Sequence, residues 1–317
     1  MARANGTNES LSLSNMQIFK VDLLDPMSIS KNVVGVLIPL FFIYVNCVML
    51  FALRRKPIFH EMPRYILFGH MLMNDSVLLL VTTIMFAIAV SVIQITKAIC
   101  TLLQFVSNCT FRNAPLTLAV MSLERYVAIC FPLRHCNIAT PKMTYIALGI
   151  IWLLSSLDVI IDIISAFIIN PYHLAEILYC SRERLFPAKW QMDKSQRFDV
   201  IYFVSVAMII IFTYISIMVT ARSVSSDKGS ARKAHRTVLL HLIQLGLCLT
   251  SFLYATIENT LNLRVANLRI LNYLIVLVLP RCLSPLIYGL RDDAVRPLFK
   301  YYFSYRSGKL RPSVNVH

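Results

Sequence analysis

Charged side chains are scarce in this chain of 317 residues. Asp, Glu, Lys and Arg make up 15% of it, whereas hydrophobic residues make up 57%. A soluble domain usually carries about 25% charged residues. So few charges do not suffice to cover a water-facing surface on such an apolar chain. We therefore expect the lipid bilayer to surround much of the protein.

Acidic residues are even less frequent than basic ones. There are 16 Asp and Glu against 31 Lys and Arg, which gives a formal net charge of +15. In a soluble protein this excess would suggest a nucleic-acid partner. Long apolar runs favour a different interpretation, because the cytoplasmic loops of membrane proteins collect Lys and Arg. We expect contact with membrane lipids and none with nucleic acid.

Several motifs of other protein classes are also missing. The polar residues 1–30 have no apolar core of the kind found in a cleavable signal peptide, so the first span is expected to direct insertion. No HExxH or comparable cluster appears, so we expect no enzyme, no metal and no cofactor. Inverted repeats and broken helices in matching halves, which are typical of secondary transporters, are not evident either.

Seven apolar stretches are long enough for a helix to cross the hydrocarbon core, which needs about 20 residues. They lie near residues 33–53, 65–93, 99–130, 143–169, 199–222, 237–260 and 268–290. The third is the least apolar and should be sheltered by its neighbours. The predicted fold is an all-α membrane protein, a seven-transmembrane helix bundle.

Three regions follow from these spans. Residues 1–32 form an extracellular tail, residues 33–290 the transmembrane domain, and residues 291–317 a cytosolic helix and tail. Residues 291–303 mix apolar and basic side chains in the manner of a short amphipathic helix lying on the membrane.

The distribution of basic residues predicts the orientation. With the N-terminus outside, the cytosolic segments hold 18 Lys and Arg and the extracellular ones 11, as the positive-inside rule requires. Glycosylation sequons at Asn5 and Asn8 then lie outside the cell. Cys100 and Cys180 also fall on this side, where an oxidising compartment favours a disulfide, although sequence alone does not prove a pairing.

Three motifs carry a resemblance to a known family. Residues 121–135 read MSLERYVAICFPLRH, residues 233–242 read KAHRTVLLHL, and residues 284–291 read SPLIYGLR. They closely resemble the odorant-receptor patterns MAYDRYVAICxPLxY, KAxxTxxxHL and NPxxYxLR. The resemblance covers about residues 33–300. The chain is therefore identified as a member of the rhodopsin-like, G-protein-coupled odorant receptors. Its short tail and the Leu-Arg-Asp sequence after the last span resemble those of teleost members.

The sequence departs from this family in three places. Glu124 replaces the usual Asp and keeps its carboxylate, whereas Ser284 replaces the usual Asn and weakens a polar link between helices. The long loop after the fourth span has one cysteine where many odorant receptors have three, so typical family loop structure does not transfer directly.

The resemblance implies an activation site at the cytosolic boundary. Arg125 is expected to be held by Glu124 at rest, and on activation to swing toward Tyr214 and the G protein. Tyr126 follows in the motif, and Tyr288 is expected to turn inward with Tyr214. The alternative is that Glu124 and Arg125 form an ordinary interfacial charge pair.

Asp75 is a carboxylate deep in the second span, and such a group is a functional candidate with a partner to be named. Family members often hold a sodium ion at this point. Arg281 occupies the facing position in the seventh span. We expect Asp75 and Arg281 to form a buried ion pair that replaces the sodium ion. The alternative is that Arg281 points to water elsewhere.

The resemblance places the ligand pocket in the outer half of the bundle. The candidate ligand-binding residues are Ser107, Asn108, Arg112, Asp158, Asp162, Tyr254 and Glu258. Asp158 and Asp162 lie four apart, on one helix face. Arg112 either forms a structural pair with Asp158 or meets a charged or polar odorant. Ser107 stands where amine receptors carry Asp, and Val278 where opsins carry the retinal-linking Lys, which argues against both ligands.

The expected function follows from this resemblance. A small odorant binds the active arrangement better and so shifts the population toward it, and a stimulatory, olfactory-type G protein docks at Arg125. The receptor would lie in the plasma membrane of sensory neuron cilia. Alternatives are a receptor of the same fold for a lipid or peptide and, with less support, a transporter.

Overall fold

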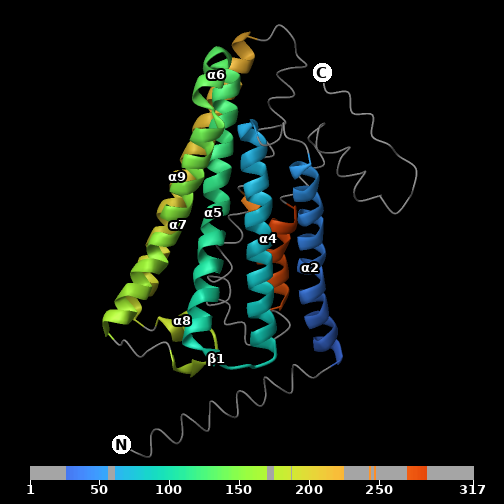
Figure 1. Ribbon diagram of the computed structural model, residues 1–317, viewed down its shortest axis with the longest axis vertical. Helices are drawn as coiled ribbons and strands as arrows, with labels where there is room; N and C mark the ends of the chain where they lie inside the picture. Colours follow the sequence, from blue (N-terminus) through green and yellow to red (C-terminus); the bar gives the residue numbers. More distant parts are fainter. Residues whose placement is uncertain are drawn as a thin grey trace, which may run out of the picture.

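The computed structural model describes residues 26–55, 61–169, 175–186, 188–224, 243, 246–247 and 270–283. Five long helices dominate this part of the chain and run along one another (Figure 1). They are α2 (Pro26–Arg54), α4 (Pro63–Val90), α5 (Lys97–Cys130), α7 (Pro141–Ile169) and α9 (Lys189–Val224). Helix α5 lies at their centre, because it packs against α4, α7 and α9.

Proline marks where several of these helices begin. Pro63 starts α4 and Pro141 starts α7, where its fixed φ suits the first helical turn and its missing N–H costs nothing. Pro39 and Pro115 lie inside α2 and α5 instead. A proline there removes a backbone hydrogen bond, which membrane helices tolerate because their neighbours compensate.

Four of the helices are long and apolar enough to cross a membrane. These stretches are Asn32–Arg54, Pro63–Val90, Pro141–Ile168 and Lys189–Thr220. Helix α5 has 34 residues, or about 51 Å at about 1.5 Å per residue, but its polar and charged residues keep it outside this set. The same residues made the third span the least apolar one in the sequence.

Two helix boundaries differ from the prediction. Helix α2 begins at Pro26 rather than at residue 33, and α9 begins at Lys189 rather than at residue 199. In both cases the extra turns are polar, so hydropathy alone did not include them. The predicted sixth span, residues 237–260, and the amphipathic helix, residues 291–303, lie outside the described residues apart from 243 and 246–247.

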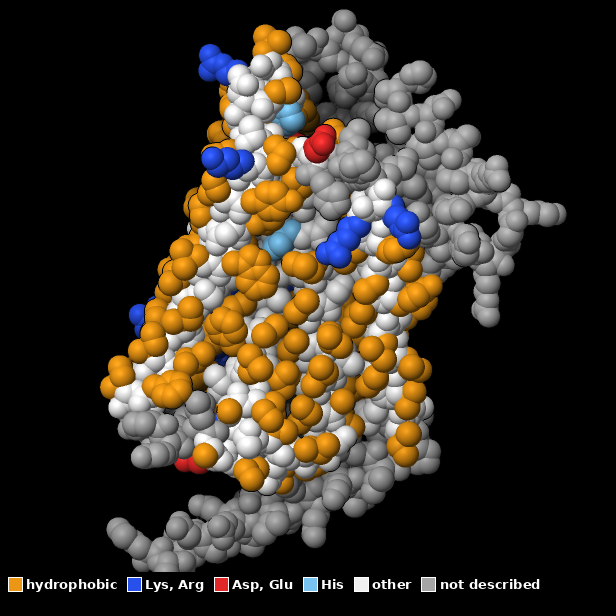
Figure 2. Space-filling model, in the orientation of Figure 1, with side chains coloured by type: hydrophobic (Ala, Val, Ile, Leu, Met, Phe, Trp, Pro, Cys, Tyr) orange, Lys and Arg blue, Asp and Glu red, His pale blue; other side chains and the backbone are white. Residues whose placement is uncertain are grey.

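The outer surface of the bundle is apolar. Figure 2 shows hydrophobic side chains covering the side of the helices, while most of the visible Lys and Arg lie toward the end that carries α6 (Pro132–Ile138). Large aliphatic residues such as Ile168, Val219 and Leu153 are more than half exposed. In water such a surface would be unstable, but lipid solvates it.

At the opposite end, a disulfide joins α5 to the loop after α7. Cys100 is bonded to Cys180, and the Cα atoms are 5.5 Å apart. Next to this bond, β1 (Ile95–Thr96) pairs antiparallel with β2 (Ile177–Leu178). The short helix α8 (Arg182–Leu185) follows and buries Leu185 against Cys100. The loop is therefore attached to the end of α5 both covalently and by backbone hydrogen bonds.

Polar side chains link the central helices within the membrane. The indole N–H of Trp152 on α7 donates to His70 Nε2 on α4 at 3.0 Å, and Thr117 of α5 lies 3.3 Å from His70 Nδ1. Asn74 of α4 donates to the carbonyl of Thr110 on α5 at 2.8 Å. These bonds fix the rotation of α4 and α7 around α5.

The last described segment, residues 270–283, contains a π-helical turn, Tyr273–Val278. The ring of Tyr273 stacks on Phe86 of α4, with centroids 4.6 Å apart. Gly35 of α2 lies close to the same ring, since a Cβ atom there would stand 2.9 Å from Phe86. A glycine is therefore needed for α2 to approach α4 closely at this point.

This close approach predicts a difference between two Gly→Ala variants. Alanine normally stabilises a helix interior by about 1 kcal/mol relative to glycine. Gly69→Ala should keep that gain, because nothing lies within 4 Å of its Cβ position. Gly35→Ala should lose it and cost about 1–3 kcal/mol through overpacking. Melting temperatures of the two purified variants compare the sites directly, and equal values would contradict the close packing.

Candidate functional site

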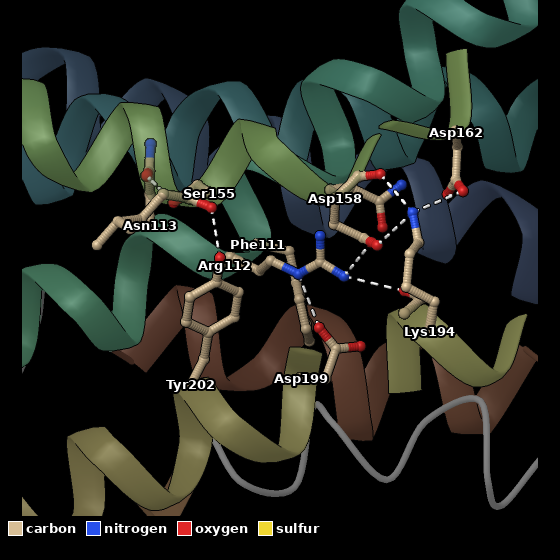
Figure 3. A network of polar contacts seen from close by, with 12 residues as sticks. Phe111, Arg112, Asn113, Ser155, Asp158, Asp162, Lys194, Asp199 and Tyr202 are labelled. Atoms are coloured by element: carbon tan, nitrogen blue, oxygen red, sulfur yellow. Dashed lines mark hydrogen bonds and ion pairs between the residues drawn. The ribbon is translucent and has the colours of Figure 1, made fainter. Parts of the chain in front are cut away.

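Arg112 lies at the centre of a buried charge network between α5, α7 and α9 (Figure 3). Its Nη2 donates to Asp158 Oδ2 at 2.8 Å and to Ser195 Oγ at 3.0 Å. Its Nε donates to Asp199 Oδ1 at 2.7 Å. Arg112 is 1% exposed, so the two carboxylates, rather than water, balance its charge.

Two further cations hold the carboxylates of α7. Lys194 Nζ lies 2.9 Å from Asp158 Oδ1 and 2.7 Å from Asp162 Oδ1. Arg182 reaches in from α8, with its Nη2 3.5 Å from Asp158 and 3.3 Å from Asp162. The network thus joins three positive to three negative side chains, and its formal charge is zero.

The balance of charge matters because the site is buried. Asp158 and Asp162 are fully buried, and an unpaired carboxylate in such a place would cost several kcal/mol, of the order of 3–5. Asp158 has three cationic neighbours and Asp162 has two, so positive charges of the protein itself offset that cost. The hydroxyl of Tyr202 also donates to the carbonyl of Leu154 nearby, which ties α9 to α7.

The predicted ligand-binding residues divide into three groups. Arg112 and Asp158 are brought together, whereas Asp162 is held by Lys194 and Arg182. Asn108 accepts a bond of 3.0 Å from Arg182 Nη1 and adjoins the network, and Ser107 lies half-buried on the same helix. The remaining two, Tyr254 and Glu258, lie outside the described residues. Of the two interpretations of Arg112, the geometry favours the structural pair.

Sequence reasoning missed Asp199, Lys194 and Arg182. It treated Asp199 as the start of a span and the other two as loop charges. A signal was present: Gln191, Ser195, Asp199 and Tyr202 recur at a helical period and continue the face of α9 toward α7. Polarity kept Gln191 and Ser195 outside the predicted span, although polar side chains are what allows this face to meet other charges inside the bundle.

The activation candidates lie near the C-terminal end of α5. Arg125 Nε is 3.2 Å from Glu124 Oε2, and His135 Nε2 of α6 is 3.4 Å from Glu124 Oε1. Tyr126 packs its ring against Phe131 and Phe212, with centroids 5.7 and 5.6 Å away. Tyr214 is half-buried on α9. Tyr288 lies outside the described residues.

Asp75 and Arg281 meet in the middle of the bundle. Arg281 Nη1 is 3.6 Å from Asp75 Oδ1, and both residues are 1% exposed. Arg281 also donates to the carbonyl of Phe111 at 3.5 Å and lies 5.5 Å from the centre of that ring. Because both side chains are removed from solvent, each serves as the counter-charge of the other.

Metal coordination finds no support in the part of the chain that the structure describes. Within those residues, no three His, Cys, Asp or Glu side chains are grouped so that they could hold a metal ion. The carboxylates that are clustered already face Arg or Lys.

These features define an integral membrane helix bundle with a charged site that extends from the middle of α5 to α8 and an arginine–glutamate pair near the C-terminal end of α5. The model of the 7 transmembrane receptor (rhodopsin family) matches residues 45–288. The chain is 38% identical over 311 residues to odorant receptor 131-2 of Danio rerio, covering 94% of this chain and 91% of that receptor.

More distant relatives carry olfactory names as well. The chain is 32% identical over 201 residues to olfactory receptor 2M7 of Homo sapiens, covering 60% of this chain and 63% of that one. It is 24% identical over 284 residues to human olfactory receptor 51G2, covering 84% and 90%. The chain therefore belongs to the rhodopsin family of seven-transmembrane receptors and, within it, to the odorant receptors.

Family membership supplies what the described residues alone do not. It implies a bundle of seven helices and a multi-pass protein of the plasma membrane, and it shows a receptor rather than an enzyme. It also confirms the family predicted from the three sequence motifs.

The charge balance around Arg112 predicts a rescue. Arg112→Met leaves the network with one excess negative charge and should cost about 3–5 kcal/mol. Adding Asp199→Asn restores neutrality, so the double variant should recover a large part of the loss. The test is a double-mutant cycle: melting temperature and surface expression are measured for the native receptor, both single variants and the double variant.

Asp193→Asn is the matched control, because Asp193 lies exposed on the same helix. Combined with Arg112→Met, it removes the same formal charge but should rescue nothing. Equal rescue by the two asparagine variants would mean that overall charge, rather than the pairing of Arg112 with Asp199, determines stability.

Proposed function

We propose that the protein is an odorant receptor that binds a small extracellular molecule within the helix bundle and activates a stimulatory G protein. The observation that carries this proposal is 38% identity to an odorant receptor over 94% of the chain. The N-terminus would be extracellular, with glycans at Asn5 and Asn8, and the receptor would lie in sensory neuron cilia. Both sequons lie outside the described residues.

The ligand would bind beside the charged network rather than through its centre. Arg112 and Asp158 are buried and engaged with each other, so their role is to hold α5, α7 and α9 at fixed spacing. Ser107 and Asn108 on α5, together with Tyr254 and Glu258, would supply polar contacts within an apolar pocket. This combination of few polar anchors and apolar walls is the usual form of a ligand site.

Coupling would occur at the opposite end. Ligand binding would shift the population toward an arrangement in which Arg125 leaves Glu124 and meets Tyr214, Tyr288 and the G protein. Helix α6 stands next to this point and buries none of its residues; Leu133 is 95% exposed. An exposed apolar side chain beside the coupling arginine suits a protein partner. Basic loops on this side also suit anionic lipid.

A receptor for a lipid or peptide is the second candidate, since one fold serves many ligands. A transporter is disfavoured by family membership. The site of expression separates the receptor classes: sensory neurons for an odorant receptor and broad tissues for the alternative.

The first test is cyclic AMP in cells that express the receptor, measured against a panel of water-soluble and volatile odorants. We expect a response that Arg125→Ala abolishes, because the variant lacks the guanidinium that meets the G protein. Arg134→Ala, an exposed neighbour on α6, should keep the response. Silence across the panel, with surface expression verified by antibody staining, would favour a non-odorant ligand.

We also propose that the Asp75–Arg281 pair takes the place of a sodium ion. The support is their separation of 3.6 Å and the burial of both. A sodium ion beside Arg281 would meet a fixed positive charge, which would repel it.

Replacing sodium with a bulky organic cation should therefore leave agonist-stimulated coupling of the native receptor unchanged. Arg281→Met uncovers the carboxylate of Asp75 and should make coupling sensitive to sodium, whereas Arg281→Met combined with Asp75→Asn should be insensitive again. Nucleotide exchange on membranes provides the measurement. Strong sodium dependence in the native receptor would contradict the pair.

A further inference from the structure

The carboxylate of Glu124 lies between two groups from different helices. Arg125, on the same helix α5, approaches Oε2 at 3.2 Å, and His135 of α6 approaches Oε1 at 3.4 Å. The side chain of Glu124 is only 9% exposed. The two neighbours therefore use different oxygens of one sheltered carboxylate, and neither has to displace the other.

His135 is also the residue that connects α6 to this carboxylate. It is half-buried, whereas every other residue of α6 is exposed. Because α6 buries no residue fully, few contacts hold it against α5. A change in the strength of the His135–Glu124 contact should therefore alter how firmly α6 is held.

We propose that His135 is a positioning residue for Arg125 and makes coupling sensitive to cytosolic pH. Protonated His135 binds Glu124 more strongly and so favours the arrangement in which both His135 and Arg125 contact Glu124, and acidification of the cytosol therefore lowers G-protein coupling. This inference rests on the proposed function, because it concerns the same coupling site.

The direction follows from the charges. A histidine changes charge between about pH 5 and pH 8. The neutral ring offers Glu124 one hydrogen bond, and the protonated ring forms a charge-assisted bond, which is stronger. Arg125 of α5 and Arg134 of α6 are the cations nearby in sequence, and Glu124 is the charged group in contact with the ring, with its Oε1 3.4 Å from Nε2. Protonation therefore favours the state in which His135 and Glu124 touch, and this contribution disappears as the pH rises.

The size of the effect should be modest. Partly exposed ion pairs change an equilibrium by about 1.5- to 5-fold. Basal and agonist-stimulated nucleotide exchange should therefore fall by a factor in that range between about pH 8 and about pH 6.

The test uses membranes that contain the full receptor with its G protein, at a series of pH values. Native receptor should lose activity as pH falls. His135→Tyr keeps a hydrogen-bond donor but stays neutral, so its profile should be flat. His135→Arg is charged at every pH, so its activity should be low and independent of pH.

Arg134→Gln, a change on the exposed side of α6, is the control and should retain the native pH profile. A native profile that is flat, rises with acid, or persists in His135→Tyr would overturn the proposal.

A second measurement separates this inference from the proposed function. An environment-sensitive fluorophore on Cys136, which is exposed on α6, reports the contact of α6 with α5 without any G protein; Cys47 and Cys248 are replaced by Ser. The emission of the fluorophore should depend on pH when residue 135 is His, and it should not depend on pH in the labelled receptor that carries His135→Tyr. A pH-dependent emission without nucleotide exchange would reject the proposed function alone, and a pH-independent emission would reject the His135 contact.

Discussion

The pairing of Arg112 with Asp158 and Asp199 is the constraint on which the rest of the bundle depends. A bilayer offers no water to solvate a buried charge, so each charged group must find its partner within the protein. Arg112 can do so only if α7 and α9 both place a carboxylate within about 3 Å of it. The requirement fixes the spacing and rotation of three helices, whereas apolar contacts with lipid are available in any arrangement. The charges therefore specify the fold where hydrophobicity does not.

The same network determines where the loop after α7 lies. Arg182 contacts Asp158 and Asp162 from α8, and the disulfide Cys100–Cys180 holds the start of that segment two residues away. The disulfide favours the pairing of Arg182 with Asp158 and Asp162, because it keeps Arg182 close to these carboxylates before the contact forms. Lys194 contacts the same two carboxylates from α9. Because Lys194 and Arg182 come from different segments, the carboxylates of α7 keep a cationic partner even when the loop that carries Arg182 moves.

The sequence predicted the family, the apolar middle of the four described membrane-length helices and the pairing of Arg112 with Asp158, whereas it missed two helix starts and the rest of the network. Hydropathy detects residues that face lipid, so it found the middle of each helix. It left Lys194 outside the fifth span and placed Asp199 at its first residue, because a charge lowers the apparent tendency to enter a membrane, although a charge facing another charge is stable there. Arg182 lies 20 residues or more along the chain from each carboxylate it contacts, and no periodicity links such distant positions. These partners can be found only once the helices are placed in space.

The middle and the C-terminal end of α5 differ in how firmly they are held, and this difference indicates where the receptor can change shape. Around Arg112, six charged side chains from α5, α7, α8 and α9 neutralise one another, and the carboxylates of α7 are fully buried. Any motion that separated them would cost the pairing of several charges at once. Around Glu124, one carboxylate meets Arg125 and His135, both partly exposed to solvent. Exposed pairs contribute about 0.2–1 kcal/mol, a range that a small ligand can overcome by preferring one state. Rearrangement at the Glu124 end of α5, with the network around Arg112 acting as a rigid frame, is therefore the least costly way to convert binding into coupling.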